Sequence, residues 1–307
     1  MNQQLRIAVL VTDIADVSIE ERHGDMHAMF QYAFYQASLN HNRKKHRKQD
    51  KVETVLDRFD VVSQPPQYPS KHDLVTGKYQ GVIITGSTRA AYDDLPWIHT
   101  LMRFIQDLQH QPNKSTFSPY GLSHDMARFK VPLIGVCFGH QIIARALGGI
   151  CEPNPNGWEF GPTLVQLTEH GKRYLQSGNR TAMRLNQFHS DHVPYLPPGF
   201  IRLATTEPHT SIQAMISTDG RCLTSQGHPE IPCAATAAYL DLLRPHVPLD
   251  LQRDASYRLE TLTQHMDSAW FADRFLQFFL GRLPPPTFAT LDLSGQDEQV
   301  VPSLASL

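Results

Sequence analysis

The segment Val131–Gln141 limits the possible folds of this chain more than any other part of the sequence. It reads VPLIGVCFGHQ, so an apolar run rich in branched residues passes through a turn into a stretch with helical spacing. The turn carries Cys137 between Gly135 and Gly139, because a turn this sharp leaves no room for bulky neighbours. This pattern is the cysteine version of the nucleophile elbow, in which a strained residue is exposed at the carboxyl edge of a sheet.

The same turn predicts the chemistry of Cys137. The N-terminus of the following helix points at the sulfur, and its positive dipole end favours the thiolate over the thiol. The backbone N–H of Phe138 is then placed to donate to a developing oxyanion. A buried cysteine in an ordinary strand-to-helix turn is the alternative, and the flanking glycines favour the nucleophile. Cys151, Cys222 and Cys233 have no such context, and we interpret them as structural.

A thiolate nucleophile needs a base, and the base needs a group that orients it. Gly227-His-Pro-Glu230 follows a predicted strand at Cys222–Ser225. Residues i and i+2 of an extended chain face the same way, so Glu230 can accept a hydrogen bond from the imidazole of His228. Pro229 keeps the residue before it extended. The chain has 16 histidines, so it is the combination with the elbow that predicts a catalytic pair.

Short apolar runs alternate with helical stripes in the first half of the chain, whereas the second half holds short strands at hairpin-like intervals. The predicted strands are Leu5–Val11, Val52–Val62, Tyr79–Thr85, Val131–Val136, Leu164–Leu167, Met183–Phe188, Ile201–Ala204, Ile212–Ile216 and Cys222–Ser225. The predicted helices are Met26–Leu39, Pro96–His110, Phe138–Leu147, Cys233–Leu243 and Leu251–Leu280, the last of which can break internally. Loops are predicted after Asp13 and at the prolines of Gln64–Pro69.

This order predicts an α/β fold with an open, mainly parallel sheet and helices on both faces. The short strands of the second half either extend that sheet or form a small antiparallel flap. Because no linker-like stretch divides the chain, we expect one domain over residues 1–282. It carries a basic insertion at about 41–51 and a polar insertion at about 111–129. Residues 283–307 form a Pro/Ser-rich tail that we expect to be disordered or loosely docked.

Charge and composition exclude several classes of protein. Lysine and arginine total 28 against 30 aspartates and glutamates, a balance unsuited to holding nucleic acid by charge. Apolar runs stay below the ~18 residues of a membrane span, and the start lacks the sections of a secretory signal. Four cysteines in 307 residues make no disulfide framework. We therefore expect a reduced, cytoplasmic enzyme, in which the basic stretch is a solvated loop or, alternatively, a nuclear address.

Four blocks of the chain resemble the class I glutamine amidotransferase family of the Cys-His-Glu type, in particular its stand-alone GMP-synthase-like members. The blocks are Ile83–Thr88 with Tyr92–Trp97, Gly135–Gln141, Asn186–Val193 and Gly227–Glu230. Matched segments span about Arg6 to Leu243, and the elbow and the His-Pro-Glu block are specific together. The resemblance implies a flavodoxin-like fold of this family.

The resemblance also implies a role for each matched residue. Cys137 attacks the γ-carbonyl of a glutamyl group, while His228, oriented by Glu230, activates it and later protonates the leaving amine. The loop at Gly86 supplies a second backbone donor to the oxyanion beside Phe138. The expected substrate-binding residues are Gln141, Glu159, Phe160 and Gly161, the last three within the stretch Trp158–Gly161.

Two features of the matched blocks raise separate questions. Ser87 stands where many relatives have a second glycine, so a positive φ at this residue would be costly. His189, Asp191 and His192 suggest either a metal site or a hydrogen-bonding cluster packed behind the active site. The chemistry of the family needs no metal, so we favour the cluster and expect neither metal nor cofactor.

Three functions stay open at this point. The first is a hydrolase that cleaves a γ-glutamyl amide through a γ-glutamyl thioester and releases ammonia from glutamine. No Gly-rich phosphate loop is visible, so an ammonia acceptor would be a separate synthetase chain or absent. The second is a γ-glutamyl peptidase that acts on glutathione-type conjugates. The third is a non-catalytic binding or regulatory module, against which the complete triad argues. The expected partner is a small γ-glutamyl substrate, with neither nucleic acid nor membrane.

Overall fold

A computed structural model of the chain describes residues 3–43, 50–109 and 131–286. Its strands are β1 (Gln3–Val11), β2 (Val52–Asp60), β3 (Gly81–Ile84), β4 (Leu133–Val136), β5 (Glu152–Pro153), β6 (Glu159–Leu167), β7 (Ala182–His189), β8 (Asp191–His192), β9 (Phe200–Thr205), β10 (Ala214–Ser217) and β11 (Cys222–Ser225). Its helices are α1 (Val17–His23), α2 (Met26–Arg43), α3 (Lys71–Val75), α4 (Pro96–Gln109), α5 (Phe138–Ala146), α6 (Glu169–Tyr174), α7 (Cys233–Leu243), α8 (Leu249–Leu262) and α9 (Ser268–Phe279).

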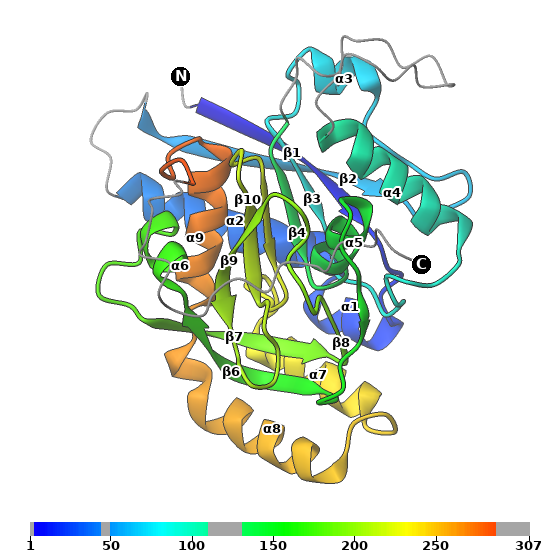
Figure 1. Ribbon diagram of the computed structural model, residues 1–307, viewed down its shortest axis with the longest axis vertical. Coiled ribbons are helices and arrows are strands. Elements are labelled where there is room, and N and C mark those ends of the chain that lie inside the picture. Colours follow the sequence, from blue (N-terminus) through cyan, green and yellow to red (C-terminus); the bar gives the residue numbers. More distant parts are fainter. Residues whose placement is uncertain (1–2, 44–49, 110–130, 287–307) are drawn as a thin grey trace, which may run out of the picture.

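One large sheet forms the centre of the molecule, with the strand order β2-β1-β3-β4-β11-β10-β9-β6-β7 (Figure 1). The strands from β2 to β11 pair in parallel. The strands from β11 to β7 pair antiparallel, and β5 and β8 form a separate antiparallel pair. The predicted open, mainly parallel sheet is confirmed. The second-half strands do both things that the sequence allowed, since some extend the sheet and two form the small flap.

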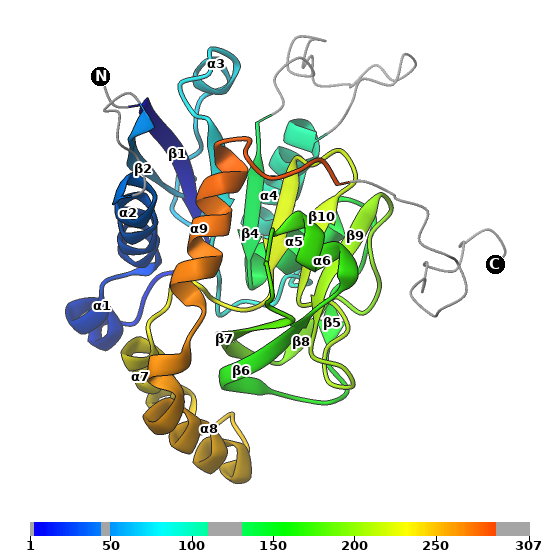
Figure 2. The same cartoon turned by 90° about the vertical axis from the view of Figure 1, so that its left-hand side faces the viewer.

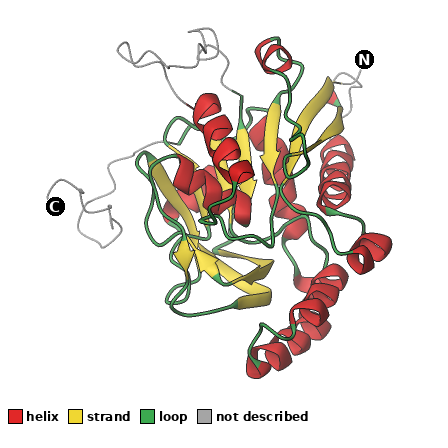
Figure 3. Ribbon diagram, turned by 90° about the vertical axis from the view of Figure 1, so that its right-hand side faces the viewer, coloured by secondary structure: helices red, strands yellow, loops and turns green. Residues whose placement is uncertain are grey.

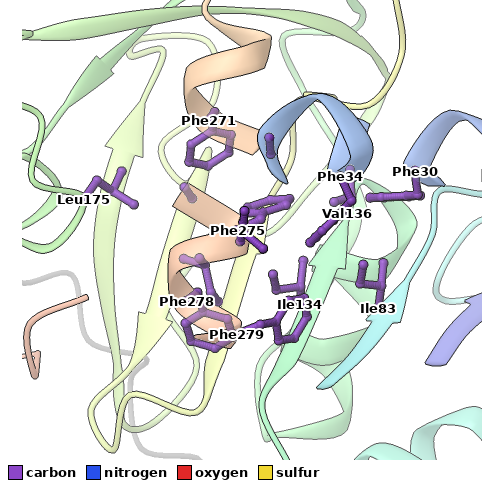
Figure 4. Packing of buried hydrophobic residues seen from close by; sticks show 14 of the residues in the cluster. Phe30, Phe34, Ile83, Ile134, Val136, Leu175, Phe271, Phe275, Phe278 and Phe279 are labelled. Atoms are coloured by element: carbon purple, nitrogen blue, oxygen red, sulfur yellow. The ribbon is translucent and has the colours of Figure 1, made fainter. Parts of the chain in front are cut away.

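Helices α2 and α9 cover one face of the sheet, as Figure 2 shows from the side. The aromatic side chains of α9, including Phe271 and Phe275, point towards Phe34 of α2 and Ile134 of β4 (Figure 4). The spacing of four residues between Phe271, Phe275 and Phe279 places them on one side of the helix. This face of α9 is therefore the part of the core that joins the C-terminal region to the parallel strands.

Helices α4 and α5 cover the opposite face of the sheet, so helices flank it on both sides (Figure 3). Ile98, Leu101 and Ile105 of α4 recur at helical spacing and are fully buried. Every residue of β3, β4 and β11 is buried, which is typical of parallel strands covered on both faces.

The parallel strands β1, β3, β4 and β11 are neighbours, so their carboxyl ends meet at one edge of the sheet. Gly86, Cys137 and His228 all lie in the segments that follow these ends. The antiparallel end of the sheet is covered by α8. Arg258 of α8 donates to the Phe160 carbonyl at 2.7 Å and thereby ties this helix to β6.

The described elements differ from the sequence predictions in two ways. The long helix predicted at Leu251–Leu280 is two helices, since the 3-10 turn Thr263–His265 separates α8 from α9. The prediction of a loop after Asp13 missed α1, and α3 and α6 were also not predicted. These three helices have seven, five and six residues, too few for a hydrophobic period to emerge.

Parts of the predicted insertions and tail lie outside the described residues. This applies to 44–49 of the basic insertion, to the polar insertion at 111–129 and to the tail from residue 287. The described start of the tail, Pro284–Pro286, lines a pocket together with His170 and Tyr174. In the described parts of the chain, no helix combines the length and the hydrophobicity needed to cross a membrane.

Candidate active site

Cys137 stands at the junction of β4 and α5 with φ 54° and ψ −109°, a conformation that few non-glycine residues adopt. Its N–H donates to the Ser225 carbonyl of β11 at 2.8 Å, so the neighbouring strand holds the turn. A Cβ at Gly135 would lie 2.4 Å from the Gly139 carbonyl oxygen, and one at Gly139 would lie 2.3 Å from the Ile84 carbonyl oxygen. Both positions therefore require glycine, which is the physical basis of the elbow pattern.

His228 and Glu230 follow β11, and their side chains are completely buried. The imidazole Nδ1 donates to Glu230 Oε1 at 2.8 Å, as the i, i+2 spacing predicts. Phe188 of β7 stacks on the ring, with 4.1 Å between centroids and 7° between planes. The His228 N–H also donates to the Asn186 carbonyl at 2.9 Å. These contacts fix the ring orientation and the tautomer, which leaves Nε2 for another partner.

The geometry directs Nε2 of His228 to Cys137. This nitrogen has no full hydrogen bond to any other described group. Burial disfavours the charged imidazole, but the nearby Glu230 and Cys137 outweigh burial and hold the pKa of His228 well above its ordinary value. A Cβ at Gly86 would lie 3.2 Å from His228 Cε1 and 3.6 Å from Cys137 Cβ, so this glycine borders both. The fold thus brings together the three residues that the sequence predicts as a triad.

The loop that follows β3 is anchored beside this group. Thr12 Oγ1 donates to the Gly86 carbonyl at 2.8 Å, which holds the loop against β1. The Gly139 N–H at the start of α5 donates to the Thr85 carbonyl at 3.1 Å, which holds it against the elbow. Ser87 is not among the described residues with positive φ, so the serine at this position carries no left-handed strain.

A pocket of about 130 Å³ opens beside Cys137. Its lining divides into a polar part and an apolar part. The polar lining residues include Asp13, Ser87, Thr88, Arg89, Gln141, His189, Ser190 and Asp191. The apolar lining residues are Met26, Trp158, Phe188, Tyr239, Leu242 and Leu243. The pocket can therefore hold a small polar molecule with an apolar group attached.

Gln141 is the one predicted substrate-binding residue that lines this pocket. Its Nε2 donates to the Asp191 carbonyl at 3.1 Å and to Gln226 Oε1 at 3.1 Å. These bonds hold the side chain in place, and they tie α5 to the segment after β7.

Glu159, Phe160 and Gly161 do not line the pocket but lie in β6 behind its wall. Glu159 is buried and bonds to His189, while Phe160 packs between Trp158 and Phe188. Gly161 has φ 79° and packs on Ala255 of α8. Any influence of these three residues on a substrate would therefore pass through the residues in front of them.

Sequence reasoning missed Asp13, Arg89 and Tyr239 as pocket residues. Asp13 follows β1 at the carboxyl edge of the sheet, so its place after a parallel strand was a usable signal. Burial raises the pKa of Asp13, although hydrogen bonds from Thr88 and the charge of Arg89 act in the opposite direction. Tyr239 lies on α7, and only the packing of that helix against the site brings it to the pocket.

The cluster of His189, Asp191 and His192 is built from hydrogen bonds. Both ring nitrogens of His189 are engaged, Nε2 with Glu159 Oε2 at 3.0 Å and Nδ1 with the Asp191 carbonyl at 2.9 Å. Among the described residues, no group of three or more histidines, cysteines or carboxylates is arranged to hold a metal ion.

The remaining cysteines are free and differ from Cys137 in their surroundings. Burial raises the pKa of the Cys151 and Cys222 thiols well above the ordinary value, so both stay protonated near neutral pH. Cys233 is partly exposed and lies 3.8 Å from Asn186 Oδ1.

Comparison with solved structures places the fold among glutamine amidotransferases. A glutamine amidotransferase from Thermotoga maritima aligns over 90% of this chain and 98% of its own, with a TM-score of 0.58 and 19% identity. One from Methylobacillus flagellatus aligns over 93% and 97%, with a TM-score of 0.57 and 19% identity. At this identity the likeness concerns the fold alone, which is the flavodoxin-like fold of class I glutamine amidotransferases.

Comparison of sequences gives the family. A glutamine amidotransferase-like protein of Schizosaccharomyces pombe is 32% identical over 242 residues, covering 78% of this chain and 84% of that protein. Gamma-glutamyl peptidase 4 of Arabidopsis thaliana is 30% identical over 177 residues, covering 57% of this chain and 61% of that protein. The family model for "Glutamine amidotransferase class-I" matches residues 118–240. With the elbow and the fold, these matches show that the chain belongs to the class I glutamine amidotransferase family.

Proposed function

We propose that this protein is a cysteine hydrolase that cleaves a γ-glutamyl amide through a γ-glutamyl thioester on Cys137. The observation that carries the proposal is the strained Cys137 beside a pocket, next to the completely buried pair of His228 and Glu230. A binding module would have no use for this strain and for the cost of burying two ionisable groups. The third possibility, a non-catalytic protein with the same fold, is therefore disfavoured.

The proposed reaction uses the three side chains in turn. The Cys137 thiolate attacks the γ-carbonyl carbon of the substrate, and the carbon–nitrogen bond breaks as Nε2 of His228 donates its proton to the leaving amine. A water molecule then loses a proton to His228 and attacks the thioester, which releases glutamate and restores the thiolate. Glu230 keeps the imidazole oriented and stabilises its charged form, in keeping with the raised pKa of His228.

Two backbone groups are proposed to stabilise the oxyanion. Phe138 is the first residue of α5, so its N–H has no partner within the helix. The second donor comes from the loop at Gly86, whose carbonyl points at Thr12. The Gly86–Ser87 peptide is trans, so the Ser87 N–H points away from Thr12, and we assign the second donor to it.

The charges of the pocket fit the amino-acid end of a γ-glutamyl substrate. Asp13 and Asp191 can accept hydrogen bonds from an α-ammonium group, and Arg89 can bind an α-carboxylate. Glutamine satisfies this pattern, and its ammonia would go either to water or to a separate synthetase chain. A related arrangement supports the second option, since a GMP synthase of Parafrankia is 34% identical over 38% of this chain.

The apolar lining favours a second candidate, a γ-glutamyl peptidase. Tyr239, Leu242 and Leu243 of α7 and Met26 of α2 offer apolar surface that the amide group of glutamine cannot fill. A larger leaving group, such as the peptide part of a glutathione-type conjugate, would bury this surface. The likeness to the gamma-glutamyl peptidases of Arabidopsis thaliana supports the same substrate class.

The decisive experiment measures free glutamate after incubation of the purified chain with glutamine or with glutathione. We expect Cys137→Ala to lower the rate by several orders of magnitude, as for other triad nucleophiles. Cys233→Ala is the matched control, because it removes a partly exposed thiol from outside the pocket and should leave the rate unchanged. Release from glutathione alone would overturn the amidase proposal in favour of the peptidase. No release from either substrate by the wild-type chain would overturn both.

A further inference from the structure

A second pair of histidine and carboxylate lies in the wall of the same pocket. His189 at the end of β7 and Glu159 at the start of β6 face each other across the antiparallel ladder. Nε2 of His189 lies 3.0 Å from Glu159 Oε2, and the two side chains are only 2% and 9% exposed. Such burial of two ionisable groups is costly unless their hydrogen bonds are complete. The proposed reaction gives this pair no role.

The hydrogen bonds of His189 determine its charge. Nε2 faces a carboxylate, and Nδ1 lies 2.9 Å from the carbonyl oxygen of Asp191. A carbonyl oxygen and an ionised carboxylate only accept hydrogen bonds, so both ring nitrogens must donate. His189 is therefore an imidazolium, provided that Glu159 is ionised.

The surroundings of Glu159 favour its ionised form. Gln213 Nε2 donates to the same carboxylate oxygen at 2.6 Å. Burial acts to raise the pKa of Glu159, but hydrogen bonds from His189 and Thr206 and the charges of His189 and His209 lower it below the ordinary value. A carboxylate that receives several donors stays charged even when it is buried.

The pair reaches the substrate pocket through Asp191. The Asp191 carbonyl accepts one hydrogen bond from His189 and a second from Gln141 Nε2, at 3.1 Å. The Asp191 carboxylate accepts from the Tyr92 hydroxyl at 3.2 Å and lines the pocket. The positions of Asp191 and Gln141 are thus coupled to one charged histidine.

We propose that Glu159 and His189 are positioning residues, in which the buried carboxylate keeps the imidazole doubly protonated and so clamps Asp191 and Gln141 for the α-amino end of a γ-glutamyl substrate. The inference rests on the proposed function and deepens it, because it assigns the residues that arrange the substrate site. It also gives Glu159 a role without contact to the substrate.

Other titratable groups face the pair from the elements packed around it. His209 Nδ1 lies 3.7 Å from Glu159 Oε2, and Asp191 follows His189 on the other side. His192 of β8 lies 3.9 Å from Glu152. His140 of α5 bonds to Thr224, and burial together with the charge of His189 lowers the pKa of His140 to about 3, so it stays neutral. His189 is therefore the cation that this arrangement favours beside Asp191.

The test compares Glu159→Gln with Glu152→Gln. An amide at position 159 can donate to Nε2, so the ring keeps its place but no longer needs the second proton. We expect KM for the γ-glutamyl substrate to rise roughly tenfold, the ratio that ~1.4 kcal/mol represents. We expect kcat to stay within about twofold, because the triad is untouched. Glu152→Gln removes an exposed carboxylate near His192 and should change neither constant.

Nitrogen-15 NMR of the histidine side chains gives a readout that does not depend on turnover. The His189 signal, assigned by its loss in His189→Gln, should show two protonated nitrogens in the wild-type chain and a neutral ring in Glu159→Gln. A neutral His189 in the wild-type chain would overturn the inference, even if Glu159→Gln does not fold. Unchanged KM in a folded, active Glu159→Gln would overturn the positioning role but leave the proposed function intact. A wild-type chain without glutamate release overturns the proposed function and the positioning role, while the NMR result still decides the charge of His189.

Discussion

At the scale of single residues, strain and close contact are concentrated at the elbow. Cys137 and Gln176 are the described non-glycine residues with positive φ, and only Cys137 lies at the pocket. The surrounding contacts hold this conformation, since Gly139 approaches Ile84 and the Cys137 N–H bonds to Ser225. Strained conformations persist only where the neighbouring structure over-determines them, and functional sites are where they cluster.

Gly139→Ala tests this local constraint. The added Cβ would lie 2.3 Å from the Ile84 carbonyl oxygen, which belongs to the backbone and cannot move away cheaply. We expect a loss of unfolding free energy of ~1–3 kcal/mol, as for other overpacked sites, together with slower alkylation of Cys137. Urea unfolding and the rate of reaction with iodoacetamide measure the two effects. Wild-type stability and reactivity in this variant would contradict the close packing.

Glu230→Gln tests the electrostatics of the triad in a Cys137→Ala background, which removes the thiolate from the comparison. The folded pKa of His228 is raised, so the pair stabilises the protein fully below the unfolded value near 6.5. This contribution declines as the pH rises above 6.5 through the folded pKa. We therefore expect Glu230→Gln to lower the unfolding free energy more at pH 6 than at pH 9. An equal loss at both values would show that the charge of His228 plays no part.

The triad was predictable from sequence because its signals are local. Gly135 and Gly139 mark the turn, and two residues separate His228 from its orienting Glu230. Asp13 and Arg89 have no such local mark, since they become pocket residues only when β1 and the loop after β3 meet at the same edge. Glu159 was predicted to bind substrate from its place in a matched segment, but the pairing of β6 with β7 directs it to His189. Its direct contact with substrate stays a prediction that the geometry does not favour.

At the scale of the elements, predictions succeeded where a period extends over many residues. Helix α7 has the predicted bounds and α4 differs by one residue, whereas the short helices α1, α3 and α6 were missed. Each short helix nevertheless has a capping signal, because Asp16, Ser70 and Thr168 accept hydrogen bonds from the first-turn backbone. Caps of this kind also occur in turns, so the residues alone do not distinguish the two.

Phe275→Ala tests the role of α9 in joining the C-terminal region to the sheet. Phe275 is 1% exposed and packs in the cluster with α2 and β4 (Figure 4). We expect a loss of ~3–5 kcal/mol of unfolding free energy, the range for a large side chain removed from a core. Tyr257→Ala on α8 is the control, since that side chain is 65% exposed and its removal should cost less than ~0.5 kcal/mol. Chemical denaturation with urea gives both values.

At the scale of the whole molecule, the pocket joins segments that are far apart in the chain. Asp13 follows β1, Asp191 follows β7 and Leu242 lies on α7, yet all three line one space. A ligand that contacts these segments together must stabilise the folded state as a whole, because unfolding any of them destroys the site.

Thermal unfolding of Cys137→Ala with and without glutamine tests this coupling. The variant should bind glutamine without cleaving it, so the melting temperature should rise with ligand concentration. At about one hundred times Kd the expected gain in stability is ~2.7 kcal/mol. Asp191→Asn in the same background should weaken the shift, because it removes a carboxylate from the pocket. A glutamine-independent melting temperature would contradict the proposed binding mode.

The sequence by itself determined the parts of this protein whose physical causes are local. The sharp turn at Cys137, the extended His228-Pro-Glu230 segment and the buried parallel strands each follow from steric limits and periodicity within a few residues. The tertiary structure alone decided which side chains share the pocket and which stand behind it. The reason is that strand order and register, which depend on contacts across the whole chain, turn Glu159 towards His189 and bring Asp13 and Tyr239 to Cys137.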